Sequence, residues 1–159
     1  MNRTTLLSWI ILLGLAQATA FSQDDKPLQP VVQVEEDLVS VESPNNGSGP
    51  LWCYGSPVLV RSGERVFVSV NETGIDVPPL CNTRWRLWER TEKGWVVLHQ
   101  DERFRNREPC PLALLGDDTL LLSANSSTQP PGTKYGPCEP DVFRFGLFTP
   151  MAPPVLELP

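Results

Sequence analysis

Two stretches of sixteen residues decide the fold: SPVLVRSGERVFVSVN at residues 56–71 and CPLALLGDDTLLLSAN at residues 110–125. In each, a proline precedes an apolar run, a glycine sits beside an acidic residue, and a second apolar run ends at an asparagine. Apolar and β-branched runs on either side of a short glycine turn are typical of β-hairpins. Each stretch therefore predicts one hairpin.

The two hairpins belong to a longer internal repeat. Proline pairs follow at residues 78–79 and 130–131, and the cysteines Cys81 and Cys138 come after them. These landmarks recur at offsets of 52 to 57 residues. A period near 50 residues that holds several short strands is typical of a β-propeller blade.

Alternation of apolar and polar residues predicts the strands of both repeats. We expect them at residues 57–61, 65–70, 83–90, 95–99, 112–115, 119–123 and 142–148. A short edge strand is also expected at residues 39–41. No helical periodicity is visible, and the 17 prolines argue against long helices.

The sequence therefore predicts an all-β chain with about one and a half four-stranded, propeller-type blades. The first repeat spans residues 51–105 and the second, incomplete repeat spans residues 106–148. A small β-sandwich stapled by disulfides is the alternative fold. Because a propeller closes only with about four or more blades, the propeller fold implies further blades or self-assembly.

The N-terminus has the pattern of a cleaved signal peptide, residues 1–20. Arg3 precedes an apolar run at residues 6–15, and Ala18-Thr19-Ala20 is a small-residue cleavage site. We expect a secreted or periplasmic protein with no membrane span after cleavage. Residues 21–50 are predicted to be an acidic leader and linker, and residues 149–159 a proline-rich tail.

The charge of the chain restricts its partners. Without residues 1–20 it carries 12 basic and 19 acidic side chains, which argues against a general nucleic-acid binder. Residues 84–107 differ, with seven basic and four acidic side chains. This stretch predicts either a solvated charged face or a place for an anionic group.

Four cysteines in an exported chain favour disulfides over metal ligation. They are Cys53, Cys81, Cys110 and Cys138, and three pairings are possible. The chain has one histidine and no C-x-x-C pair, so we expect no metal site and no cofactor.

Strand 83–90 carries a ladder of arginine and tryptophan. Alternation puts Trp85 on one face, which we expect to be core, and Arg84, Arg86 and Trp88 on the other. Aromatic rings beside planar donors can bind sugars, so these three residues are candidate ligand-binding residues.

Residues 107–122, REPCPLALLGDDTLLL, resemble the opening strands of sialidase-like β-propellers, in which an R-x-P motif precedes a strand, a Gly-Asp turn and a second strand. Residues 91–95, TEKGW, share the Gly and a Trp with that family's Asp-box turn, S-x-D-x-G-x-x-W, but lack its Ser and Asp. The resemblance covers residues 51–148. It implies that Arg107 occupies the position of an arginine that binds a sugar carboxylate, with the catalytic residues in later blades.

Three hypotheses for the function follow. The first is an exported sialidase-like propeller segment that binds a glycan or a protein partner without catalysis, through Arg107 and the arginine–tryptophan ladder. The second is the N-terminal part of an exo-acting glycoside hydrolase that is completed by downstream blades. The third is a disulfide-stapled extracellular structural or adhesion domain. No complete catalytic set of residues is recognisable.

Overall fold

The structure is a computed structural model. It describes residues 29–47, 56–78, 80–116, 118–130, 133 and 136–157. The chain divides into two units, Met1–Glu36 and Asp37–Pro159. The described part of the first unit, residues 29–36, is exposed and has no regular secondary structure. The expected signal peptide and Cys53 lie outside the described residues.

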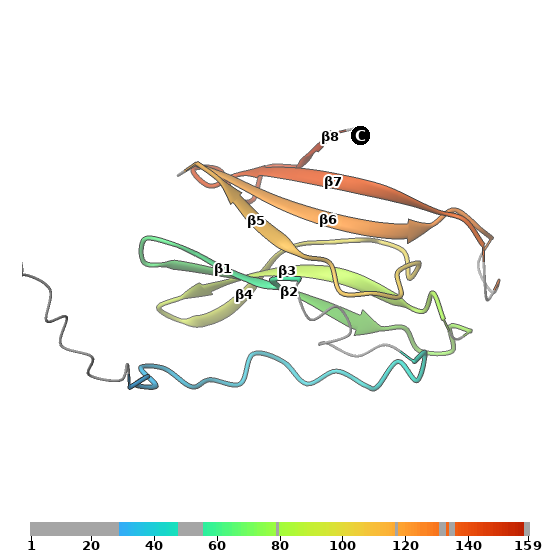
Figure 1. The fold of residues 1–159 in the computed structure, drawn as a ribbon, viewed down its shortest axis with the longest axis horizontal. Coiled ribbons are helices and arrows are strands. Elements are labelled where there is room, and N and C mark those ends of the chain that lie inside the picture. The colour runs from blue at the N-terminus through green and yellow to red at the C-terminus, as the bar shows by residue number, and fades with distance from the viewer. Residues whose placement is uncertain are drawn as a thin grey trace, which may run out of the picture. The chain divides into compact units, whose positions relative to one another are not determined.

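The described residues of the second unit form two four-stranded antiparallel sheets and no helix, which confirms the all-β prediction. Sheet A has the order β1-β2-β3-β4, and sheet B has the order β5-β6-β7-β8 (Figure 1). The strands are β1 (Leu59–Ser62), β2 (Arg65–Thr73), β3 (Thr83–Thr91), β4 (Gly94–Gln100), β5 (Leu112–Leu115), β6 (Thr119–Ser127), β7 (Cys138–Gly146) and β8 (Val155–Glu157).

The two sheets repeat one another strand by strand. β1 and β5 have four residues each, whereas β2, β3, β6 and β7 have nine each. The hairpin turns also correspond, because Gly63 (φ 59°) and Gly116 (φ 65°) both adopt the left-handed conformation that glycine permits. The cysteines do not correspond: Cys138 is the first residue of β7, whereas Cys81 precedes β3 by two residues.

Two sequence predictions are corrected. Residues 39–41 do not form a strand. The second repeat is not limited to three strands, because the tail contributes β8, which pairs Val155 with Arg144 and Leu156 with Phe143. The sequence pattern did not predict this strand because of the prolines at positions 153 and 154. They come directly before the strand, where proline is tolerated, and not within it.

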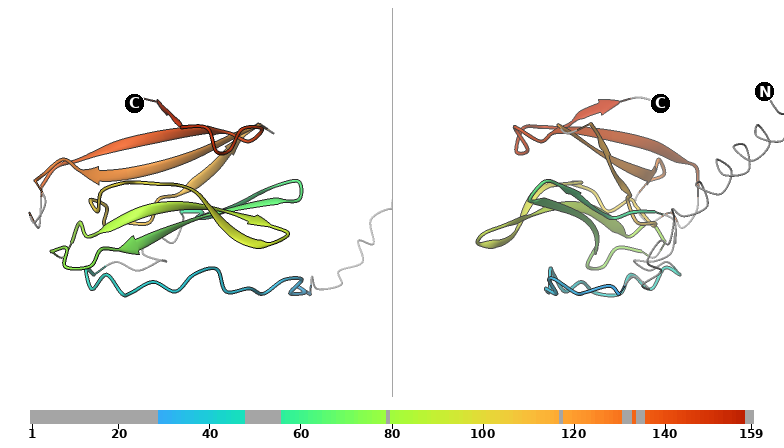
Figure 2. Two further views of the ribbon diagram at one scale, coloured as in Figure 1. Left: turned by 180° about the vertical axis from the view of Figure 1, so that it is seen from behind. Right: turned by 60° about the vertical axis from the view of Figure 1, so that its left-hand side comes forward.

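Sheet A and sheet B pack face to face and share one apolar core (Figure 2). Sheet A contributes Phe67, Trp85, Leu87 and Leu98, and sheet B contributes Leu112, Leu120, Leu122, Ala124 and Phe145. The prediction that Trp85 lies in the core is confirmed, since its side chain is 3% exposed. Its ring centroid lies 5.1 Å from that of Phe143 and 6.4 Å from that of Phe145.

A polar junction, formed by Thr83, Arg105, Asn106, Ser126 and Ser127, joins the sheets at one end. The backbone of Thr83 in β3 exchanges hydrogen bonds with Asn106, at 3.0 and 2.8 Å. The backbone N–H of Ser127 in β6 donates to the carbonyl of Arg105 at 2.8 Å, and the Ser126 hydroxyl donates to Asn106 Oδ1 at 2.8 Å. Residues 105 and 106 therefore connect β3 of sheet A with β6 of sheet B through hydrogen bonds.

Residues 37–47 are fixed to the end of sheet A by side-chain hydrogen bonds. The Thr73 hydroxyl donates to the carbonyl of Glu42 at 2.6 Å, and Asn82 Nδ2 donates to the carbonyl of Pro44 at 2.9 Å. Buried Asn46 donates through Nδ2 to Asn82 Oδ1 at 3.0 Å. This segment forms one wall of the cavity described next.

Candidate functional site

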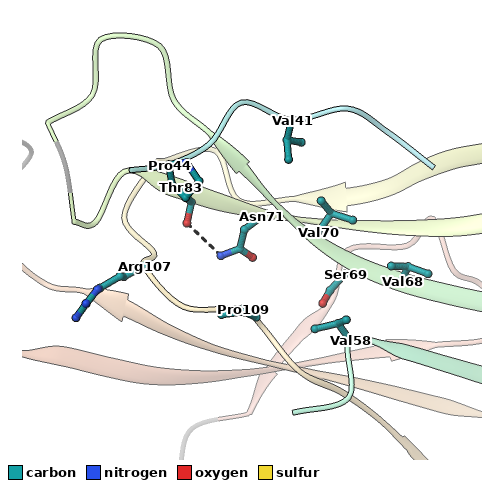
Figure 3. Close-up of a pocket in the computed structure, with 10 residues that line it drawn as sticks. All are labelled: Val41, Pro44, Val58, Val68, Ser69, Val70, Asn71, Thr83, Arg107 and Pro109. Carbon is teal, nitrogen blue, oxygen red and sulfur yellow. Dashed lines mark hydrogen bonds between the residues drawn. The ribbon is translucent and has the colours of Figure 1, made fainter. Parts of the chain in front are cut away.

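A cavity of about 210 Å³ lies at the edge of β2 and is here named the β2-edge pocket (Figure 3). Its lining is mostly aliphatic. The lining residues are Val41, Pro44, Val58, Val68, Ser69, Val70, Asn71, Thr83, Arg107 and Pro109.

The strand pairing explains why the pocket forms at this place. β1 pairs only with the first part of β2, from Arg65 to Val68. Ser69 and Asn71 face the core side of sheet A, because they pair with Leu87 and Trp85, whereas Val68 and Val70 face the other side. Residues from both faces of β2 line the pocket, so the cavity wraps around the strand edge where β1 has ended.

Asn71 provides a buried hydrogen-bond acceptor in this pocket. Its Nδ2 donates to Thr83 Oγ1 at 3.1 Å and to the carbonyl of Glu108 at 2.7 Å. Its Oδ1 is buried and has no hydrogen-bond partner among the described residues. In Figure 3 the amide oxygen points away from Thr83. A buried acceptor left unpaired costs about 1–3 kcal/mol, and a ligand N–H that reached this oxygen after a small shift of the pocket wall would recover part of that energy.

Arg107, the residue implied by the family resemblance, lies in the connection between β4 and β5 and lines the same pocket. Its Nε donates to the carbonyl of Asn46 at 3.4 Å. The guanidinium therefore links the 37–47 segment to the pocket wall.

Arg84, Arg86 and Trp88 lie together on the face of sheet A that points away from the core, as expected from the alternation. The two arginines share one carboxylate, because Glu72 Oε2 is 2.6 Å from Arg84 Nε and Glu72 Oε1 is 3.6 Å from Arg86 Nη1. Each guanidinium group also stacks on an aromatic ring, with its Cζ 4.8 Å from the ring centroid. Arg84 stacks on Phe104, and Arg86 stacks on Trp88. The indole face that the sequence suggested for a ligand is therefore covered by a neighbouring arginine.

A second cavity, of about 420 Å³, opens beside the polar junction and is here named the junction pocket. Its lining is more polar than that of the β2-edge pocket. The lining residues are Val77, Pro78, Cys81, Arg103, Phe104, Arg105, Ser127, Thr128, Gln129, Pro130 and Thr133. Arg105 forms two ion pairs, from Nε to Asp101 Oδ2 at 2.9 Å and from Nη2 to Asp141 Oδ2 at 3.7 Å. No described acidic side chain pairs with Arg103.

The described cysteines, Cys81, Cys110 and Cys138, carry free thiols. Cys110 is buried, and its Sγ lies 3.8 Å from the carbonyl of Glu108. Burial, followed by the charges of Asp101 and Glu108, raises the pKa of the Cys110 thiol to about 12. The disulfides expected from the sequence are not present among these three residues.

The described residues contain no group of three or more His, Cys, Asp or Glu side chains placed to hold a metal ion. In the same part of the chain we found no helix with the length and apolar character needed to span a membrane. Comparison with known proteins found no matching family model, curated protein or solved structure.

The sequence did not identify Asn71 and the valines of the β2-edge pocket as site residues. One signal was available: Phe67, Ser69 and Asn71 are spaced by two residues, and Asn71 directly follows the predicted strand 65–70, so in an extended chain they share a face. Phe67 marks that face as the core side, and an amide at a core-facing position needs hydrogen-bond partners. The pocket itself also depends on residues 37–47, whose position no local pattern predicts.

Proposed function

We propose that this chain is an exported, non-catalytic binding module that recognises an extended segment of a protein partner. The β2-edge pocket takes an aliphatic side chain, and a backbone N–H of the partner donates to Asn71 Oδ1. The unpaired, buried Asn71 oxygen in a mostly aliphatic cavity is the observation that carries this proposal. A ligand with both an apolar group and an adjacent N–H fits that combination.

The pocket chemistry favours a protein segment over a sugar ring. Four valines and two prolines line it, and it contains no aromatic platform. A sugar hydroxyl placed against these side chains would lose its hydrogen bonds to water, whereas an aliphatic side chain gains about 0.8 kcal/mol per buried CH₂. The volume also suits one side chain, since a cavity of about 150 Å³ can hold benzene.

We further propose that sheet A and sheet B are two successive propeller-type blades of the sialidase-like kind. Each sheet is a meander of four strands in chain order. This order supports blades, because an immunoglobulin-type sandwich distributes consecutive strands between its two sheets. On this proposal the outer faces of the pair are where further blades or another copy would pack.

The proposed function is tested by peptide selection on the full chain. A phage-displayed library of linear peptides is selected on the immobilised protein, and the affinities of the recovered peptides are measured by calorimetry. We expect a consensus with one aliphatic residue at a fixed position. Selected peptides that share no aliphatic position, or a library that yields no binder, would contradict the proposal.

A pair of matched variants shows whether such peptides use the pocket. Val41 lines the pocket and is 45% exposed, and Val39 in the same segment is 38% exposed but does not line it. Val41→Asp places a charge in the aliphatic pocket and is expected to weaken peptide binding at least tenfold. Val39→Asp is expected to bind as the wild type does. Equal binding by both variants would exclude the pocket.

A second candidate function is binding of an acidic glycan in the junction pocket. Arg103, which has no acidic partner among the described residues, favours it, because a guanidinium binds a carboxylate at two points. The hydroxyl and amide side chains of Ser127, Thr128, Gln129 and Thr133 could contact sugar hydroxyls. Titration with N-acetylneuraminic acid and with a neutral hexose tests this, and equal binding of both sugars would contradict it.

A further inference from the structure

Two of the described cysteines lie at the same end of the two sheets. Cys138 begins β7 and pairs with Ser127, the last residue of β6. Cys81 lies two residues before Thr83, the first residue of β3. β3 and β7 therefore both begin at this end, each at or just after a cysteine.

The polar junction brings these two strand ends together. Thr83 is hydrogen-bonded to Asn106, and the adjacent residue, Arg105, accepts a hydrogen bond from the backbone N–H of Ser127. Cys81 and Ser127 also line the junction pocket together. Cys81 therefore lies beside the end of β6. Cys138 lies at the same end, because it pairs with Ser127, the last residue of β6.

We propose that Cys81 and Cys138, whose thiols are free in the structure, form a disulfide on oxidation that joins sheet A to sheet B at this end. The bond would connect the residues directly before β3 with the first residue of β7. It would close the loop of chain that includes β3, β4, β5 and β6. The assignment selects one pairing among those that the sequence left open.

The electrostatics of the thiols agree with this proximity. Burial, followed by the charges of Cys81 and Glu108, raises the pKa of the Cys138 thiol. Cys138 is exposed and Cys81 is half-buried, so both can react with a thiol reagent or a redox partner. Cys110 is 1% exposed and is protected from such a partner.

The reaction is thiol–disulfide exchange with a carrier disulfide, such as oxidised glutathione or an exported oxidoreductase. The thiolate of one cysteine attacks the carrier, which releases one carrier thiol and leaves a mixed disulfide. The second cysteine, as its thiolate, attacks that mixed disulfide, forms the Cys81–Cys138 bond and releases the second carrier thiol. Two protein thiols are oxidised, one carrier disulfide is reduced, and the two protons pass to the carrier thiols.

Peptide mapping tests the pairing directly, because trypsin places each cysteine in a different peptide. Cys81 falls in residues 66–84, Cys110 in residues 108–134 and Cys138 in residues 135–144, while Cys53 falls before Arg61. The full chain is equilibrated with reduced and oxidised glutathione, its remaining thiols are alkylated at acidic pH, and it is digested without reduction. We expect peptides 66–84 and 135–144 to be recovered as one linked species. Alkylated thiols on both peptides, or a link from either to another cysteine, would overturn the proposal.

Variants provide an independent readout. The wild-type chain is expected to unfold at a lower urea concentration after reduction, because the reduced unfolded chain is no longer constrained. Cys138→Ser is expected to show a smaller reduction-dependent shift of the midpoint than the wild type. A shift of the wild-type size in Cys138→Ser would overturn the assignment. If this variant does not fold, the peptide map of the wild-type chain still decides between the outcomes.

Discussion

Replacing Trp85 tests whether the two sheets form one cooperative unit. Its indole is 3% exposed, and its ring contacts Phe143 and Phe145 of sheet B. Trp85→Ala removes a buried aromatic side chain, which costs about 3–5 kcal/mol, and each aromatic pair contributes about 0.5–1.5 kcal/mol beyond the area that it buries. We therefore expect a loss of about 4 kcal/mol in the free energy of unfolding, a large part of the 5–15 kcal/mol typical of a domain.

The assay combines urea unfolding, followed by far-UV circular dichroism, with hydrogen exchange of the β6 amides of Leu120 and Leu122. Because the core is shared, exchange in β6 is expected to accelerate as much as exchange in β3. Trp88→Ala is the matched control: this residue lies on the outer face beneath Arg86, and its loss is expected to cost about 1 kcal/mol. Unchanged protection of β6 in Trp85→Ala would refute the shared core.

Three further predictions concern single positions, and urea unfolding measures each of them. Since the pKa of Cys110 rises from 9.0 to about 12 on folding, stability should be intact below pH 9 and fall by about 1.4 kcal/mol per pH unit between those values. Cys110→Ala should lack that slope, and an equal slope would contradict the assignment. Ser126→Ala leaves Asn106 Oδ1 buried without its donor, at a cost of about 1–3 kcal/mol, and a neutral result would contradict the junction. At Gly63, where an added Cβ meets nothing within 4 Å, Ala should cost about 1–2 kcal/mol from its positive φ alone and Asn less; equal costs would contradict this cause.

The strands were predictable because their residues carry local information. The glycine turns at Gly63 and Gly116 and the alternation around Trp85 all depend on neighbours in the sequence, and each is confirmed. β7 begins at Cys138, four residues before the predicted start, because its first residues pair with the end of β6 although they are polar or proline. Pairing with a neighbouring strand decided that boundary, not the apolar pattern.

The candidate site was less predictable because it depends on contacts between distant segments. The resemblance implied Arg107, which does line the β2-edge pocket. The ladder of Arg84 and Arg86 was suggested for ligand binding, but Glu72 and the stacking contacts already engage both guanidinium groups. Glu72 is adjacent to them only through the β2–β3 register, which the strand pattern alone does not give.

The most direct test of the proposed function is an NMR titration of the methyl-labelled full chain with a selected peptide. The proposal predicts saturable shifts of the methyl signals of Val41, Val58, Val68 and Val70, together with a shift of the Asn71 side-chain amide as its oxygen gains a donor. Saturable shifts confined to the junction pocket, or none at these five residues, would contradict binding at the β2-edge pocket.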